Sequence, residues 1–466
     1  MCLRLQWLNP VNERKQYGRE RFCNLTEGSR MERRQQHFSR TGAIVDLAAI
    51  RSNMESLAKA ARSVNPDIGL LATVKADAYG HGACEVANAL AGTACMYSVA
   101  CIDEGIELRT AGGIKAPILI LGPVFAGDDE DTFRYGLTQT VFTLERAKQL
   151  NDNAALYDTE RKSDPDEIKA RARAEGDKAG EIVALLREDE RKRETEQNGT
   201  EDPGFDDGCA HVHIAVDTGM SRIGLTPDEG GLAILREICS MPNIRVDGIF
   251  THFATADESD KTEAMKALDS FRRFRVMAEE AGIRIPIWHC ANTASIIDGI
   301  GLEGFEMARA GIGLYGMYPS EEVQKENVLL TPALTWYAYI NHVKEIEAGT
   351  SVSYGYRFTA DRRMRIGTVC IGYADGYPRS LSLKGTEVLV NGRRCPILGR
   401  ICMDQMMIDL SSFAEGEIFP GVPVILLGAA GQDKITAEEL ADRYGTINYE
   451  ITCNISRRVP RKYINR

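Results

Sequence analysis

A lysine is the first residue of this sequence whose setting could support chemistry. The apolar run ending at Val74 predicts a strand, and Lys75 follows it directly, beside the glycine-rich segment Gly80-His81-Gly82. A lysine that is partly removed from water loses its proton more easily, and its neutral amine can form a Schiff base. Lys75 is therefore a candidate nucleophile and base.

Two later segments provide groups that bind an anion. Residues 289–295 lie at the end of one predicted strand and contain asparagine, threonine and serine, and residues 309–313 lie at the end of the next and contain two glycines. Small hydroxyl side chains and backbone N–H groups in such loops bind phosphate, most often after the seventh and eighth strands of a barrel. A lysine facing a phosphate site indicates pyridoxal phosphate, which needs both an imine partner and an anion site.

Short β-rich runs alternate with helical patterns between residues 43 and 315, and this order positions the lysine and the loops. Apolar residues recur at spacings of three and four residues in the helical stretches 83–90, 103–111, 228–239 and 261–281. We predict eight parallel strands, at 68–74, 97–101, 117–122, 139–142, 211–217, 246–252, 286–290 and 306–310. Eight such units predict an α/β fold of the (β/α)₈ barrel type, with its active site at the carboxyl ends of the strands.

A different pattern begins after Pro332, where short strands alternate with turn signals. We predict strands at 388–392, 395–398, 406–410 and 422–427, and Asn391-Gly392 between two of them is a strong hairpin signal. The sequence therefore predicts a barrel over residues 41–332 and a smaller β-rich domain over 333–466. The early run 42–47 is expected to pair with this second domain.

Two segments fit neither domain. Residues 1–40 contain nine Arg and Lys and four Glu, with no apolar stretch after them. We interpret them as a disordered basic extension rather than a signal peptide, with Met31 as a candidate start. Residues 158–207 contain 17 acidic and 10 basic residues. They are interpreted as a charged insertion in a surface loop, with a partner-binding helix as the less favoured alternative.

Composition excludes several classes of protein. The net charge of -11 argues against nucleic acid or an anionic membrane as a partner. No apolar run approaches the roughly 20 residues that a membrane helix needs. The twelve cysteines form no Cys-x-x-Cys pair, and His211 and His213 have no third ligand nearby, so no metal site is expected. Reduced thiols fit a cytoplasmic protein best.

Ordered motifs from about residue 42 to the end resemble the alanine racemase family, excluding the charged insertion. They are the sequences VKADAYGHG (74–82), DTGMSRIG (217–224), THFATAD (251–257), ARAGIGLYG (308–316), VSYG (352–355), IGYADG (371–376), GRICMDQ (399–405) and TINYE (446–450). Eight motifs in the same order make chance resemblance negligible.

The resemblance implies a two-base racemisation of alanine, which would supply D-alanine for peptidoglycan. Lys75 would hold the cofactor and handle the proton on one face of Cα, and Tyr354 would serve the opposite face. In the family this tyrosine comes from the second subunit, which implies a homodimer with shared active sites. His252 would pack against the cofactor ring and touch Arg309.

The resemblance also assigns the remaining site residues. Arg309 would face the pyridine nitrogen and keep it unprotonated, which limits the carbanion stabilisation that invites transamination. Arg222, the backbone at Met403 and Tyr373 would form the substrate site, with Tyr373 and Tyr449 narrowing the access. The cofactor-binding positions, mostly around the phosphate, are Tyr79, Asn292, Thr293, Gly311, Ile312 and Tyr449.

Two positions depart from the family pattern. Thr293 stands where the family usually has serine, and it keeps the hydroxyl. Ala215 stands where many relatives have a lysine that becomes carbamylated and steadies the arginine equivalent to Arg222. The sequence leaves open whether a bound anion holds Arg222 instead or whether Arg222 is less well aligned.

Other functions are kept as alternatives. A racemase of another small amino acid, such as serine, is poorly discriminated, because one hydroxyl changes little in a mostly apolar pocket. A catalytically impaired protein that binds pyridoxal phosphate is the second alternative, raised by Ala215 and the insertion. A carrier made of the barrel alone would lack Tyr354 and the second domain. A decarboxylase is disfavoured, since Arg309 replaces the acidic partner that such chemistry favours.

Overall fold

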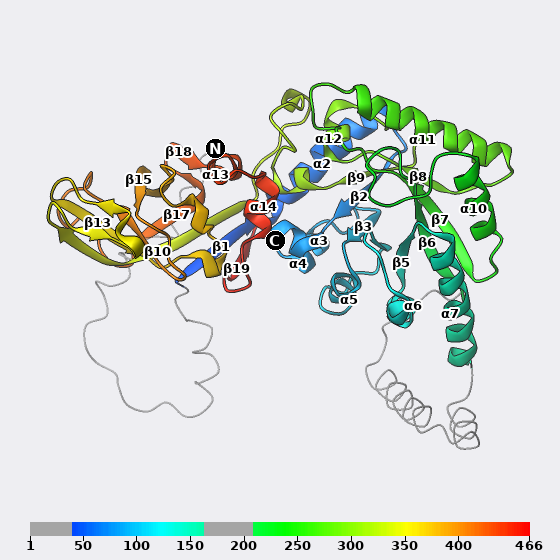
Figure 1. Ribbon diagram of the computed structural model, residues 1–466, viewed down its shortest axis with the longest axis horizontal. Coiled ribbons are helices and arrows are strands. Elements are labelled where there is room, and N and C mark those ends of the chain that lie inside the picture. The colour runs from blue at the N-terminus through cyan, green and yellow to red at the C-terminus, as the bar shows by residue number, and fades with distance from the viewer. Residues whose placement is uncertain (1–39, 163–207) are drawn as a thin grey trace, which may run out of the picture.

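The computed structural model describes residues 40–162 and 208–466 (Figure 1). The predicted extension before Arg40, the candidate start at Met31 and most of the charged insertion lie outside these residues. The chain forms two lobes side by side, a barrel of strands and helices and a lobe made mainly of strands, with α3 (Lys75–Gly80), α4 (Ala83–Ala89) and α14 (Asn448–Cys453) between them.

Eight parallel strands form the barrel, as the sequence predicted, with bounds that differ by a few residues. They are β2 (Gly69–Thr73), β3 (Met96–Val99), β4 (Ile118–Ile120), β5 (Leu137–Val141), β6 (Ala210–Ala215), β7 (Ile244–Phe250), β8 (Ile287–His289) and β9 (Met307–Ala310). Their order is β8-β7-β6-β5-β4-β3-β2-β9. The N–H of Glu306 donates to Trp288 O (3.1 Å) and that of Arg309 to Ala291 O (3.0 Å), which brings the two end strands together.

Helices cover the outside of this barrel, and polar residues fix where several of them begin. Asp46 caps α2 by accepting hydrogen bonds from Ala48 and Ala49, and Asp228 caps α10 by accepting from Gly231. The helices are α2 (Leu47–Val64), α4, α5 (Ile102–Thr110), α6 (Asp129–Arg134), α7 (Leu144–Lys162), α10 (Glu229–Cys239), α11 (Thr262–Glu280) and α12 (Thr293–Asp298).

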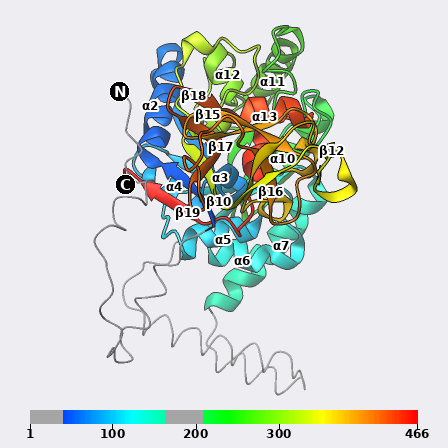
Figure 2. The same ribbon diagram turned by 90° about the vertical axis from the view of Figure 1, so that its left-hand side faces the viewer.

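The second lobe is built on a nine-stranded sheet. In Figure 2 this lobe faces the viewer. Its strands are β1 (Thr41–Asp46), β10 (Leu334–Ile346), β13 (Met364–Val369), β14 (Glu387–Val390), β15 (Arg393–Leu398), β16 (Met406–Asp409), β17 (Pro423–Ala430), β18 (Asp433–Ile435) and β19 (Arg461–Ile464). Because β17 pairs with both β14 and β10, six of these strands close on themselves. Two short strands, β11 (Ser351–Val352) and β12 (Phe358–Thr359), and α13 (Ala437–Tyr444) complete the lobe.

Two predictions about this lobe are confirmed. Residues 42–46 of the early run lie in β1, which pairs with β10, so this strand belongs to the second sheet although it precedes the barrel in the sequence. Asn391 and Gly392 join β14 to β15 with φ angles of 47° and 78°. Positive φ at both central residues is the geometry of a two-residue hairpin turn.

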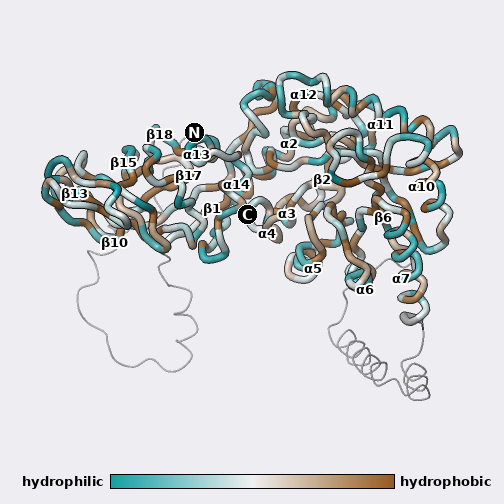
Figure 3. Tube along the Cα trace, viewed as in Figure 1, coloured by the Kyte–Doolittle hydropathy of each residue, from teal (hydrophilic) through white to brown (hydrophobic). Residues whose placement is uncertain are grey.

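A single cluster of buried apolar side chains runs through both lobes, from Leu57 in α2 to Trp336 in β10 and Leu440 in α13. Figure 3 shows the hydrophobic residues interspersed with hydrophilic ones along the helices. No helix of the described residues is long and apolar enough to span a membrane. Because the lobes share this core, they hold residues from both sides of the junction in fixed positions.

Candidate active site

Lys75 lies where the sequence predicted, at the carboxyl end of the first barrel strand. Its side chain is half-buried at the junction of the lobes. Burial lowers the pKa of the Lys75 ammonium, and the positive charge of Arg222 acts in the same direction, while Glu104 opposes them. A lowered pKa increases the share of neutral amine near neutral pH, which is the form that acts as nucleophile and base.

The segment after Lys75 forms one turn of left-handed helix. Four consecutive residues other than glycine, from Ala76 to Tyr79, have φ angles of 52° to 53°. Such a conformation costs roughly 1–2 kcal/mol per residue, so surrounding contacts must hold it. The Ala76 N–H donates to Glu104 (2.6 Å), and the Ala83 N–H donates to Asp77 (2.9 Å).

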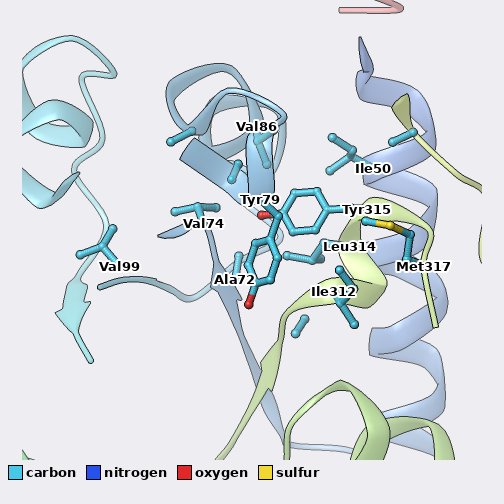
Figure 4. Close-up of a cluster of buried hydrophobic side chains, with 14 of the residues drawn as sticks. Ile50, Ala72, Val74, Tyr79, Val86, Val99, Ile312, Leu314, Tyr315 and Met317 are labelled. Atoms are coloured by element: carbon cyan, nitrogen blue, oxygen red, sulfur yellow. The ribbon is translucent and has the colours of Figure 1, made fainter. Parts of the chain in front are cut away.

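This turn places the Tyr79 ring between two other tyrosines. Its ring centroid lies 5.0 Å from that of Tyr315 and 5.9 Å from that of Tyr449 in α14. Figure 4 shows the rings of Tyr79 and Tyr315 next to each other. Burial raises the pKa of the Tyr79 hydroxyl well above its usual value. The hydroxyl therefore stays protonated and can donate a hydrogen bond to an anion.

Hydroxyl groups from two sides of the barrel converge on the backbone of Gly311. The Thr293 Oγ1 atom accepts hydrogen bonds from the N–H groups of Gly311 (2.9 Å) and Gly313 (3.4 Å). A Cβ at Gly311 would lie 3.4 Å from the Tyr79 Oη and 3.6 Å from the Thr293 Oγ1. Ile312 follows in the same turn. Hydroxyl and amide donors around a bare glycine backbone suit a phosphate group.

Asn292 has a structural role beside this phosphate-binding candidate. Its side-chain oxygen accepts from the Ser295 N–H (3.0 Å) and the Ser295 Oγ (3.1 Å), which caps α12. Asn292 therefore caps the N-terminus of α12, whose first residue is Thr293.

Arg309 is buried and bonded to neutral groups. Its Nη1 atom is 3.0 Å from His289 Nδ1, and its Nη2 atom is 3.1 Å from His252 Nδ1. Its guanidinium also donates to the carbonyl oxygens of Thr251, His289 and Cys290. Burial lowers the pKa of Arg309 to about 10, so the group remains a cation at neutral pH.

The expected contact between His252 and Arg309 is thus present. Burial and the charge of Arg309 lower the pKa of His252 to about 3, so its ring is neutral. A neutral flat ring beside a buried cation can stack on an aromatic cofactor without adding charge. The sequence placed the second histidine, His289, next to a site motif but gave it no role in the site, because nothing in its local sequence identifies it as a partner of Arg309.

Arg222 and Ala215 lie on the β6 side of the barrel mouth. Arg222 is exposed, and within residues 40–162 and 208–466 it makes no hydrogen bond or ion pair with another side chain. Ala215 is buried and offers no polar group. The cation at Arg222 is therefore available to a carboxylate, but this chain's described part does not fix its orientation.

Tyr354, Tyr373 and Met403 lie apart from the lysine, on the second lobe. Tyr354 is 69% exposed and Met403 52% exposed, and both line a depression of about 590 Å³. The N–H of Tyr373 donates to Cys402 O (3.1 Å), which joins the loops that present these residues. The segment that contains Tyr354 belongs to the yellow part of the second lobe in Figure 1, whereas Lys75 begins α3 at the junction of the lobes.

The two histidines of β6 have different partners. His211 Nδ1 lies 2.6 Å from Asp247 at the barrel surface, whereas His213 is buried and its Nδ1 lies 2.9 Å from His289 Nε2. The described part of the chain contains no group of three side chains arranged to hold a metal ion.

Comparison with known proteins identifies the family. The family model described as alanine racemase, N-terminal domain matches residues 45–162 and 177–319, and that of the C-terminal domain matches 333–463. The alanine racemase of Desulforamulus reducens is 40% identical over 91% of this chain and 98% of its own length. That of Halothermothrix orenii is 39% identical over 91% and 97%.

Solved structures agree with this result. The alanine racemase of Clostridium difficile superposes with a TM-score of 0.75 at 35% identity, covering 92% of this chain and 97% of that one. The enzyme of Bacillus anthracis with bound L-Ala-P gives 0.73 at 33% identity, covering 92% and 96%. Fold and site define an isomerase of the barrel type that depends on pyridoxal phosphate. The chain belongs to the alanine racemase family.

Proposed function

We propose that this protein interconverts L-alanine and D-alanine by a two-base mechanism and supplies D-alanine for peptidoglycan. The observation that carries the proposal is a buried Arg309 bonded to neutral groups, on the same barrel as a half-buried Lys75 and a hydroxyl-lined glycine turn. The names of the similar proteins support alanine as the substrate. They disfavour serine and an impaired binding protein as alternatives.

The residues of the barrel mouth fit pyridoxal phosphate. Tyr79, Thr293 and the backbone at Gly311 and Ile312 would bind its phosphate, and Tyr449 packs beside Tyr79. Arg309 would face the ring nitrogen and His252 the ring. When bound, the cofactor withdraws electrons from Cα of an attached amino acid and makes its proton acidic.

A substitution at Thr293 tests whether this residue binds the phosphate of the cofactor. We expect Thr293→Val to weaken pyridoxal phosphate binding about tenfold, because it removes a donor to the anion and leaves the Gly311 N–H without its acceptor. Fluorescence titration of the apoprotein measures this affinity. Thr293→Ser keeps the hydroxyl and should bind normally, and equal affinities for the valine and serine variants would refute the assignment.

Lys75 and Tyr354 of the partner subunit would act on opposite faces of the substrate. The Lys75 Nζ takes or returns the proton on one face of Cα, and the tyrosine hydroxyl does so on the other. The exposure of Tyr354 supports a shared site, since its own chain leaves it on the surface. The dimer brings this surface to the mouth of the other barrel.

Substrate recognition would use the positive charge of Arg222 and a narrow entry to the site. Arg222 would pair with the carboxylate of alanine, and the backbone at Met403 would add a donor. Tyr373 and Tyr449 would narrow the entry and favour a small side chain. The ten cysteines of the described part are all free thiols, which supports action in the cytoplasm.

Mixing two inactive variants tests the shared site directly. Lys75→Ala and Tyr354→Phe each spoil both sites of their own homodimer, but a mixed dimer has one site with an intact lysine and an intact tyrosine. After subunit exchange at equal concentrations, about a quarter of the wild-type activity should return, because half of the dimers are mixed. Return of no activity, with exchange confirmed by mass spectrometry, would exclude sites shared between subunits.

A further inference from the structure

Arg309 is the first member of a chain of groups that continues inside the barrel. Its Nη1 atom lies 3.0 Å from His289 Nδ1, and His289 Nε2 lies 2.9 Å from His213 Nδ1. His289 and His213 are completely buried. His213 comes from β6, on another side of the barrel from β9, and no part of the proposed function assigns it a role.

The chemistry of arginine determines which ring nitrogens of His289 and His213 carry protons. A guanidinium has donors only, so His289 Nδ1 must be unprotonated and accept. Burial keeps His289 neutral, so its one proton is on Nε2 and is donated to His213 Nδ1. His213 Nδ1 is therefore an acceptor too, and the proton of its neutral ring is on Nε2, a buried atom without a partner in the described structure.

The surroundings hold both rings in place. Phe250 stacks on His289 with centroids 5.2 Å apart. A Cβ at Gly248 would lie 2.6 to 2.8 Å from three ring atoms of His213, so this ring occupies space that a larger residue would fill. An isolated neutral histidine exchanges between tautomers, and His213, as the acceptor at Nε2, stabilises the same His289 tautomer that Arg309 requires at Nδ1.

We propose that His213 is a positioning residue of the active site. By accepting the His289 proton, it keeps His289 Nδ1 as the acceptor that holds Arg309 in place. This inference rests on the proposed function, in which Arg309 keeps the cofactor nitrogen unprotonated. A loosely held Arg309 would admit a proton to that nitrogen and favour transamination over racemisation.

The first experiment reads the tautomers without catalysis. ¹⁵N-histidine labelling of the holoenzyme gives few signals, because the chain has only seven histidines. The signals lost in His213→Asn and His289→Asn identify the two rings. Both should show a protonated Nε2 and a bare Nδ1, and a protonated Nδ1 on either ring would overturn the proposal.

The second experiment measures pyruvate formed per racemisation event. In transamination alanine transfers its amino group to the cofactor aldehyde, so alanine leaves as pyruvate, the aldehyde becomes an amine, and no outside oxidant is needed. His213→Leu removes the acceptor and should raise this ratio about tenfold, while His213→Asn, whose oxygen replaces Nδ1, should restore a low ratio.

A neighbouring histidine provides the matched control. His211 lies two residues away on β6 and bonds to Asp247, so His211→Leu should leave the pyruvate ratio unchanged. Equal ratios for the leucine and asparagine variants of His213 would contradict the proposal. If the wild-type protein does not racemise alanine, the proposed function is refuted. The ¹⁵N signals would still test the proton positions in that case.

Discussion

Lys75→Ala is expected to abolish the covalent attachment of pyridoxal phosphate and to lower the racemisation rate by at least about 10³-fold. The substitution removes the amine that forms the Schiff base and, in the same step, the base for one face of Cα. After borohydride reduction, mass spectrometry of peptides should find the cofactor on Lys75 of the wild-type protein and on no peptide of the variant.

An exposed lysine serves as the control for this result. Lys59 lies on the solvent side of α2, and Lys59→Ala should keep both the attached cofactor and the activity. Reductive labelling of a peptide other than the one containing Lys75 in the wild-type protein would show that the assignment of the cofactor lysine is wrong.

Tyr354→Phe is expected to lower racemisation by about 10²- to 10⁴-fold, the usual contribution of a positioned acid–base group. The variant keeps the ring and loses only the hydroxyl. Because Lys75 is untouched, exchange of the Cα proton with solvent should continue for one enantiomer of alanine and fail for the other. Chiral chromatography and NMR in D₂O measure conversion and exchange separately.

The neighbouring Tyr356 provides the matched control for this experiment. It is 75% exposed, against 69% for Tyr354, and Tyr356→Phe removes a hydroxyl from the same short turn. We expect the activity of that variant to equal the wild-type activity. Equal exchange of both enantiomers by Tyr354→Phe would remove this tyrosine from the two-base mechanism.

The sequence predicted the fold well, because the strand and helix patterns were regular. All eight barrel strands lie within a few residues of their predicted bounds, and the Asn391-Gly392 turn joins the strands expected of it. Local patterns determine such elements, since the alternation of apolar residues and the turn residues act over a few positions. The pairing of β1 with the second sheet was also expected.

Other features depend on contacts that a single sequence does not display. The left-handed turn of Ala76–Tyr79 contains no glycine, and its alanines and tyrosine normally avoid positive φ. Hydrogen bonds from Ala76 to Glu104 and from Ala83 to Asp77 hold it in place. The chain from Arg309 through His289 to His213 links three different strands or strand ends. Its members are far apart in sequence, so only the closed barrel brings them together.

The positions of Tyr354 and Arg222 show a further limit of sequence reasoning. The resemblance assigned Arg222 to the site with Lys75 and Tyr354 to the site of the second subunit, and in the described chain Tyr354 lies exposed on the other lobe. Arg222 is exposed, yet it lies close enough to Lys75 for its charge to lower the pKa of that lysine, and it has no side-chain partner in the described residues. The motifs alone do not say which copy of the chain provides each residue, and only the family resemblance assigned Tyr354 to the second subunit.

The most direct test of the two-base account is the conversion of L-alanine in D₂O by the purified protein loaded with pyridoxal phosphate. If Lys75 and Tyr354 serve opposite faces, the proton removed on one side is not the one returned on the other. We predict that the D-alanine formed at early times has deuterium at Cα. D-alanine that retains its original Cα proton would show a single base acting on both faces and would contradict the account.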